Sequence, residues 1–160
     1  MNERPISTGK LSRVPQSEVI DQVDRAIIEV LTADGRATLA KLSDKTGLSV
    51  SAVQSRVQKL ERRGIIAGYR AVVDHEALGT PISAFVSVTP LDYSQQSQIP
   101  ARLAEIAGVM SCYSIAGAPS YMLLVRTQSP SHLEDLLNTI HASVPVSTQT
   151  TLILQAYFEE

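Results

Sequence analysis

Residues 47–64, GLSVSAVQSRVQKLERRG, decide the fold of the first half of this 160-residue chain. Gly47 tolerates the left-handed backbone of a sharp turn, and Ser49 can cap a helix that ends at Gly64. Apolar side chains recur in that helix at spacings of three and four, which predicts one buried face: Val50, Val53, Val57 and Leu60. The opposite face is polar and basic: Ser51, Gln54, Ser55, Gln58, Lys59 and Arg62.

Two shorter helical patterns precede this stretch. The first begins near Asp21, whose side chain can cap it, and the second is capped by Thr38 and ends at Gly47. Three short helices with a glycine-containing turn before the last are typical of a helix-turn-helix domain. We place this domain at residues 17–64, after a loose tail of residues 1–16. A small three-helix bundle with a merely solvated outer face fits the same pattern equally well.

The local charge favours a nucleic-acid partner, although the whole chain has a net charge of -2. Residues 45–70 hold six basic residues and one acidic residue. Arginine and lysine neutralise phosphates, while serine and glutamine can hydrogen-bond base edges in the major groove. Because one such helix makes few contacts, we expect double-stranded DNA to be bound by a two-fold dimer.

The candidate DNA-binding residues cluster on and around the third helix. They are Thr38, Ser49, Ser51, Ala52, Gln54, Ser55, Arg56, Gln58, Lys59, Arg62 and Arg63. Arg56 lies toward the edge of the buried face, so it can either contact phosphate or brace Glu61 or a neighbouring helix. The sequence leaves both roles open.

The second half of the chain has a different character. Residues 65–73 are apolar and β-prone and predict a strand or short hairpin within a linker over residues 65–79. Beyond it, strands are expected at residues 83–88, 109–115, 121–127 and 146–157, and helices at residues 100–107, with a start as early as 94, and 130–142. The order βαββαβ over residues 80–160 predicts an α+β fold, a ferredoxin-like sandwich with two helices on one face of an antiparallel sheet.

Several classes of protein are disfavoured. No apolar run approaches the roughly 20 residues that cross a bilayer, and there is no signal-peptide core, so we expect a cytoplasmic protein. The lone Cys112 is typical of a small buried hydrophobe. His75, His132 and His141 lie far apart without neighbours at metal-ligand spacing, so we expect no metal site. Nucleotide-binding and nucleophile motifs are missing from the sequence, and we expect neither a cofactor nor an enzyme.

Residues 20–74 resemble the helix-turn-helix domain and linker of the Lrp/AsnC (feast/famine, leucine-responsive) transcription regulators. The matching motifs are Asp21 and Asp24, Asp34-Gly35-Arg36, Leu42, Gly47-Leu48-Ser49, Arg56-Val57, Leu60-Glu61, Gly64-Ile65-Ile66 and Gly68-Tyr69. The βαββαβ half resembles the effector-sensing and oligomerisation domain of the same family. The resemblance implies a winged-type domain that binds DNA sequence-specifically, association with the nucleoid, and homodimers that assemble further into octamers. It also implies an amino-acid effector bound between dimers.

The chain departs from the family at one loop. Where the family usually has Gly-Asp-x-Asp-Tyr, this sequence has Gly117-Ala118-Pro119-Ser120-Tyr121 and so lacks both carboxylates that could pair with an ammonium group. We nevertheless expect the effector pocket there, formed when dimers meet. Its expected residues are Gly117, Ala118, Pro119, Ser120, Tyr121, Thr148 and Thr150. Tyr121 is more often a packed strand residue than a ligand contact.

Two other readings compete with a DNA-binding regulator. The chain can be a small-molecule-binding module that acts on another protein, with the helical domain as a docking element. It can also be a small enzyme on a ferredoxin-like scaffold, since this fold does not fix function. The lack of an acid, base or nucleophile cluster disfavours the enzyme, and a steep loss of duplex affinity with salt would separate DNA binding from docking.

Overall fold

The computed structural model describes residues 20–157, so the expected tail of residues 1–16 lies outside the described residues. The chain divides into two compact units, and the boundary between them falls between Ala71 and Val72, inside the linker that the sequence predicts. Each unit has its own hydrophobic core.

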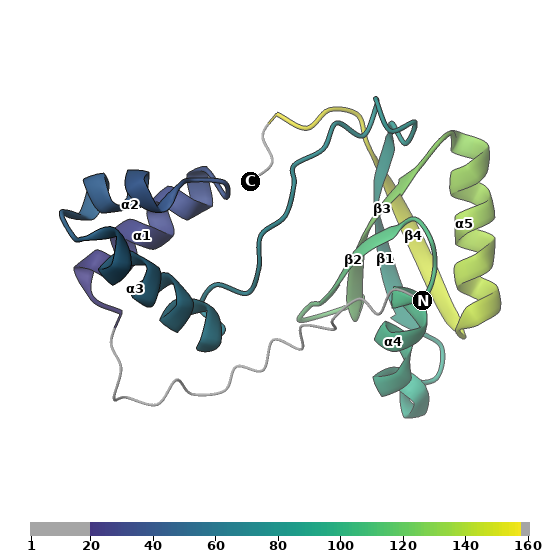
Figure 1. The fold of residues 1–160 in the computed structure, drawn as a ribbon. Helices are drawn as coiled ribbons and strands as arrows, with labels where there is room; N and C mark the ends of the chain where they lie inside the picture. The colour runs from purple at the N-terminus through teal and green to yellow at the C-terminus, as the bar shows by residue number, and fades with distance from the viewer. Residues whose placement is uncertain (1–19, 158–160) are drawn as a thin grey trace. The chain divides into compact units, whose positions relative to one another are not determined.

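The first unit contains three helices: α1 (Gln22–Ala33), α2 (Leu39–Thr46) and α3 (Val50–Arg62) (Figure 1). Each begins at the cap that the sequence predicts, because a side-chain oxygen accepts a free N–H of the first turn. Asp21 Oδ1 accepts the N–H of Asp24 at 2.8 Å, and Thr38 Oγ1 accepts that of Lys41 at 3.2 Å. Gly47, with φ of 70°, makes the turn between α2 and α3.

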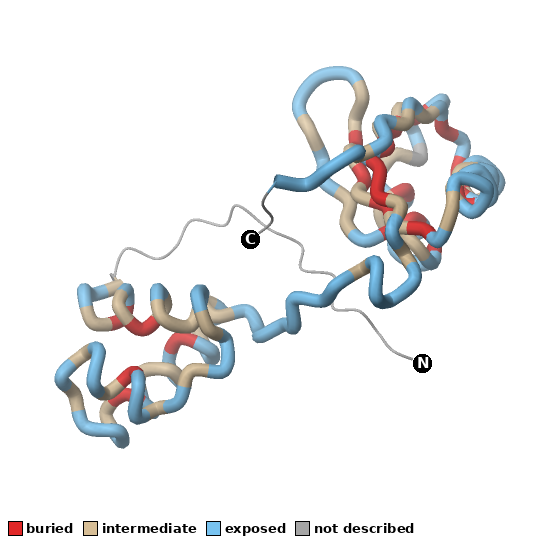
Figure 2. The backbone as a smooth tube through the Cα atoms, turned by 90° about the horizontal axis from the view of Figure 1, so that it is seen from above, coloured by how far each residue is buried: buried red, intermediate tan, exposed pale blue. Residues whose placement is uncertain are grey.

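Four fully buried side chains form the centre of this unit: Ile27, Leu42, Val53 and Leu60. Figure 2 shows the buried stretches of the backbone in red. The expected buried face of α3 is wrong at one position, because Val50 is 46% exposed. Val50 is the first residue of α3, and the packed surface begins one turn later at Val53.

The second unit is built around one sheet. Its elements are β1 (Ile82–Pro90), the 3-10 helix η1 (Tyr93–Gln98), α4 (Ile99–Ala104), β2 (Val109–Ser114), β3 (Tyr121–Thr127), α5 (Pro130–Ser143) and β4 (Val146–Ile153). The strand order is β2-β3-β1-β4 and every pairing is antiparallel, which confirms the predicted ferredoxin-like βαββαβ sandwich (Figure 1). The last strand ends at Ile153, earlier than the sequence predicts.

The two faces of the sheet differ in burial. Alternate residues of β1 and β3 pack with α4 and α5 in the core, and the central ones are Ala84, Val86, Val88, Leu123 and Val125. Within residues 72–157 no helix covers the opposite face, which we call the open face. Phe85 on β1 stands on this face and is 44% exposed.

The expected strand over residues 65–73 does not form in the single chain, nor does a β-wing, since the described part of the first unit contains only helices, turns and irregular backbone. A strand requires a hydrogen-bonded neighbour, and residues 20–157 supply none to this segment. Instead, Ile65 and Ile66 pack against the helical core, and both backbone N–H groups donate to the carbonyl oxygen of Leu60.

Candidate DNA interface and effector site

The outer face of α3 carries only polar and basic side chains. All six predicted there are exposed: Ser51, Gln54, Ser55, Gln58, Lys59 and Arg62. On the opposite side, Val53 and Leu60 are buried in the core. The helix is therefore fixed to its unit by one face and presents hydrogen-bonding groups and positive charge on the other.

The remaining candidate DNA contacts lie around this face with varied exposure. Thr38 and Ser49 are exposed helix caps, and the Ser49 hydroxyl also lies 3.2 Å from that of Ser51. Ala52 and Arg63 are half-buried. The two caps stand at the N-termini of α2 and α3, and such N-termini favour anions such as phosphate.

Arg56 takes the bracing arrangement that the sequence left open, with α1 as its partner instead of Glu61. Its Nη1 atom lies 2.7 Å from Asp21 Oδ2 and 2.8 Å from Asp24 Oδ1. The hydrogen bond from the Asp24 N–H and that from Arg56 hold the pKa of Asp21 below its usual value. The carboxylates of Asp24 and Asp21 raise the pKa of Arg56.

The start of the linker attaches to the helical unit through Tyr69, a contact that the sequence does not reveal. The Tyr69 hydroxyl donates to Glu61 Oε1 at 2.9 Å, and its ring borders Gly35. Partial burial and the Glu61 carboxylate raise the pKa of Tyr69. The motif Gly68-Tyr69 marks the residue, but the partner of its hydroxyl depends on how the chain turns after α3.

The structure does not bring all the expected effector residues together. Ala118, Pro119 and Thr148 line a hollow of about 260 Å³. Tyr121 is instead a packed strand residue, 5% exposed, whose hydroxyl donates to the carbonyl oxygen of Gln96 at 2.9 Å. The hydroxyl of Thr148 lies 2.9 Å from His141 Nε2 on α5, and Thr150 pairs with the buried Val86. These three side chains belong to the helix-covered side of the sheet.

Four further residues of this hollow were missed by sequence reasoning: Ser87, Thr89, Ser147 and Gln149. Ser87 pairs with Gln149, and Thr89 pairs with Ser147, so β1 and β4, the first and last strands of the unit in sequence, form one wall of the hollow. Alternation along β1 predicts that Ser87 and Thr89 share a face, but only the pairing of β1 with β3, in which Val88 lies opposite Tyr121, places them beside the loop at residues 117–120.

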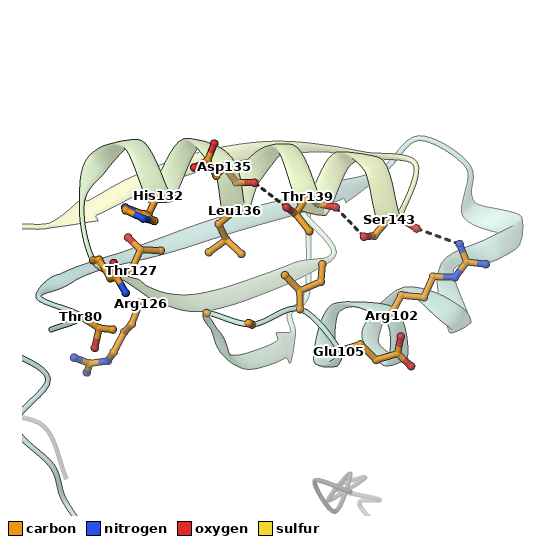
Figure 3. A pocket seen from close by; sticks show the side chains of 14 residues that line it. Thr80, Arg102, Glu105, Arg126, Thr127, His132, Asp135, Leu136, Thr139 and Ser143 are labelled. Atoms are coloured by element: carbon orange, nitrogen blue, oxygen red, sulfur yellow. Dashed lines mark hydrogen bonds between the residues drawn. The ribbon is translucent and has the colours of Figure 1, made fainter. Parts of the chain in front are cut away.

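A larger hollow of about 910 Å³ lies between α5 and the segment that leads from α4 into β2. Ile106 and Leu136 are among its lining residues, and the charged side chains of Arg102, Glu105 and Arg126 point in different directions around Leu136 (Figure 3). Arg102 donates to the carbonyl oxygen of Ser143 at 3.1 Å at one end. None of the expected effector residues lines this hollow.

Residues that can support metal or thiol chemistry are dispersed. Each histidine has a hydroxyl neighbour: Thr80 for His75, Ser129 for His132 and Thr148 for His141. Among residues 20–157 there is no group of three or more potential metal ligands. Cys112 packs against the core, and burial raises its pKa. In the same range, no helix is long and apolar enough to span a membrane.

Comparison with known proteins identifies both units. The AsnC-type helix-turn-helix domain matches residues 20–61, and the Lrp/AsnC ligand binding domain matches residues 83–160. The chain belongs to the Lrp/AsnC family of transcription regulators. The HTH-type transcriptional regulator LrpA of Mycobacterium tuberculosis is 51% identical over 144 residues, which cover 90% of this chain and 96% of LrpA.

Solved structures of Lrp/AsnC proteins share the whole fold. A feast or famine regulatory protein from M. tuberculosis, solved in complex with L-methionine, has a TM-score of 0.86 at 51% identity over 89% of this chain and 97% of its own. AsnC from Escherichia coli has a TM-score of 0.81 at 28% identity, with the same coverage of both chains. The Lrp/AsnC chain described here is therefore a DNA-binding transcription regulator with a ligand-binding domain. The regulatory names of its relatives confirm that it is not an enzyme.

Proposed function

We propose that α3 is the recognition helix and enters the major groove with its outer face. Lys59 and Arg62 neutralise phosphates in this proposal, and Ser51, Gln54 and Ser55 hydrogen-bond base edges. The observation that carries it is the separation of the two faces of α3, with Val53 and Leu60 buried and all six residues of the polar face exposed. The other proposed contacts are Thr38, Ser49, Ala52, Gln58 and Arg63. Arg56, the remaining candidate from the sequence, instead pairs with Asp21 and Asp24.

Replacement of single residues on α3 tests these roles. We expect Lys59→Ala or Arg62→Ala to weaken binding to all duplexes and to lower the slope of log K against log salt by about 0.9 per lost contact. We expect Gln54→Ala to change which sequence is enriched from a randomised duplex pool. If both sets of variants lost affinity equally for all duplex sequences, this result would contradict a base-reading role for the serine and glutamine side chains. Complete lack of duplex affinity in the unmodified protein would favour the docking reading.

We further propose that the chain acts as a homodimer, assembling to an octamer, so that two recognition helices reach half-sites about one helical turn (34 Å) apart. The open face of the sheet supports this proposal, because Phe85 and Tyr113 expose 44% and 59% of their surfaces there. The linker also lacks a strand partner within residues 20–157, and a second copy can supply one. Sedimentation of the purified protein tests the assembly, and a monomer at micromolar concentration would contradict it.

The effector in this proposal is an amino acid or a related small molecule, bound between dimers near the loop at residues 117–121. The L-methionine complex of the M. tuberculosis relative supports this class of ligand. The polar residues that line the hollow beside the loop carry hydroxyl or amide groups, and no lining residue is charged. A bound ammonium group would therefore be held by neutral acceptors such as Gln149 and backbone carbonyls. Calorimetry across the amino acids tests the proposal, and an affinity indifferent to Gln149→Ala and Ser120→Ala would contradict it.

One experiment addresses target and effector together. Genomic DNA fragments are selected on the protein with and without each amino acid, and enrichment is compared. A regulator enriches a defined set of fragments, and an effector changes that set or its yield.

Fluorescence microscopy of the tagged protein tests the remaining proposal, that the protein is cytoplasmic and associated with the nucleoid.

A further inference from the structure

A cluster of charged side chains joins the middle of α3 to the start of α1. One guanidinium nitrogen of Arg56 lies within 2.8 Å of carboxylate oxygens from both Asp21 and Asp24. Asp24 is only 8% exposed, so its carboxylate has little access to water. The second oxygen of Asp21 accepts the N–H of Asp24 at 2.8 Å. The three side chains thus form a connected set of charge-assisted hydrogen bonds between the two helices.

The position of Arg56 on α3 suits it to fix the rotation of that helix about its axis. Arg56 follows Val53 by three residues and precedes Leu60 by four, so it flanks the buried stripe. The hydrophobic attraction that buries Val53 and Leu60 is itself non-directional. The hydrogen bonds of Arg56 depend on distance and angle, and they oppose rotation in either direction.

Small rotations matter for base recognition. Side-chain tips lie about 5–6 Å from a helix axis, so a rotation of about 10° moves them by about 1 Å. Hydrogen bonds to base edges tolerate only about 0.5 Å of such movement. Phosphate attraction is less demanding, because it acts over a Debye length of about 8–10 Å. Loss of rotational control therefore reduces sequence selectivity while non-specific binding persists.

We propose that Arg56, held by Asp21 and Asp24, is a positioning residue that orients the recognition helix and thereby sets DNA sequence selectivity. Its guanidinium acts through α1 and not as a phosphate ligand. This inference rests on the proposed DNA-binding role of α3. A positioning residue and a phosphate ligand are distinguished by measurement. Loss of a phosphate ligand weakens binding to every duplex, whereas loss of a positioning residue weakens binding mainly to the preferred sequence.

The experiment compares two duplexes by fluorescence anisotropy across a salt series. One duplex is recovered from a randomised pool by selection on the unmodified full-length protein, and the other has the same composition in scrambled order. For Arg56→Met we expect affinity for the selected duplex to fall at least tenfold more than affinity for the scrambled duplex, with an unchanged salt slope. Arg62→Met is the matched control on the same helix, and we expect a uniform loss and a slope lower by about 0.9.

Two variants test the cluster without removing the arginine. Asp21→Ser keeps a good helix cap but loses the carboxylate, and Asp24→Asn keeps the side-chain shape but loses the charge. Both leave a more positive protein, which by itself strengthens binding to any duplex. We expect both to lower the ratio of selected to scrambled affinity at least threefold. The double variant Arg56→Met/Asp24→Asn should show no further loss beyond Arg56→Met, because the two residues act as one unit.

Each result decides between the roles. A uniform loss in Arg56→Met with a slope lower by about 0.9 would identify a phosphate contact and overturn the inference. Unchanged affinity ratios in both Asp21→Ser and Asp24→Asn would also overturn it, even if Arg56→Met fails to fold. If the unmodified protein enriches no duplex, the proposed function itself fails. If the unmodified protein enriches a duplex but the variants lose affinity equally for the selected and the scrambled duplex, only the positioning role is wrong.

Discussion

Two valines one turn apart on α3 provide a matched test of how the helical unit is held together. Val53 is fully buried, whereas Val50 is 46% exposed at the first position of the helix. Val53→Ala removes two methyl groups, which costs about 1.6 kcal/mol of transfer free energy at about 0.8 kcal/mol each. The cavity left behind adds to this cost, while the better helix propensity of alanine returns up to about 0.5 kcal/mol.

The net expected cost of Val53→Ala is therefore about 2 kcal/mol of unfolding free energy. A unit of this size has a total stability of only about 2–7 kcal/mol at about 0.05–0.15 kcal/mol per residue. The substitution should thus raise the population of the unfolded helical unit by about 30-fold, since about 1.4 kcal/mol is a factor of ten. Val50→Ala should change stability by less than about 0.5 kcal/mol, because its side chain is half solvated and alanine favours the helix.

Hydrogen exchange measured by mass spectrometry on the full chain separates the two units. Peptides from α1 to α3 should exchange about 30-fold faster in Val53→Ala and nearly unchanged in Val50→Ala. Peptides from β1 and β3 serve as an internal reference, because they belong to the second unit and its separate core. Equal acceleration in the two variants would refute the assignment of the buried face. Equal acceleration in both units would refute their independent cores.

Three further predictions concern single groups. Because the hydrogen bonds of Asp21 to the Asp24 N–H and to Arg56 lower its pKa, its contribution to stability is present above the unfolded pKa. That contribution is lost as pH falls through the lower folded pKa, and acid titration by circular dichroism should show a weaker pH dependence in Asp21→Ser. The pKa of Tyr69 is raised, so its contribution is complete below the unfolded value and is lost as pH rises through the folded pKa. Ultraviolet titration at alkaline pH should therefore detect a lower tyrosine pKa in Glu61→Gln, and an unchanged curve would argue against the contact. Gly47→Ala should cost about 1–2 kcal/mol in thermal denaturation, because Gly47 has a φ of 70°, and a neutral effect would show that the turn can relax.

Local signals in the sequence were sufficient for the helical elements and for the fold class. Thr38 and Ser49 cap the helices where predicted, because a cap depends only on residues three positions apart. The expected strand at residues 65–73 failed for the opposite reason, since a strand exists only with a neighbour. The exposure of Val50 was not predictable for a similar reason, because the burial of the first residue of a helix depends on which distant segments pack around it.

The sequence by itself determined the three capped helices, the βαββαβ order and the polar outer face of GLSVSAVQSRVQKLERRG, because propensity, capping and periodicity act over a few residues. Only the tertiary structure decided that Arg56 faces Asp21 and Asp24, which precede it by more than 30 residues. It also decided that the loop at residues 117–120 lies beside Ser87 and Gln149, while Tyr121 turns into the core. Contacts between distant segments follow from helix packing and strand register, which no local pattern encodes.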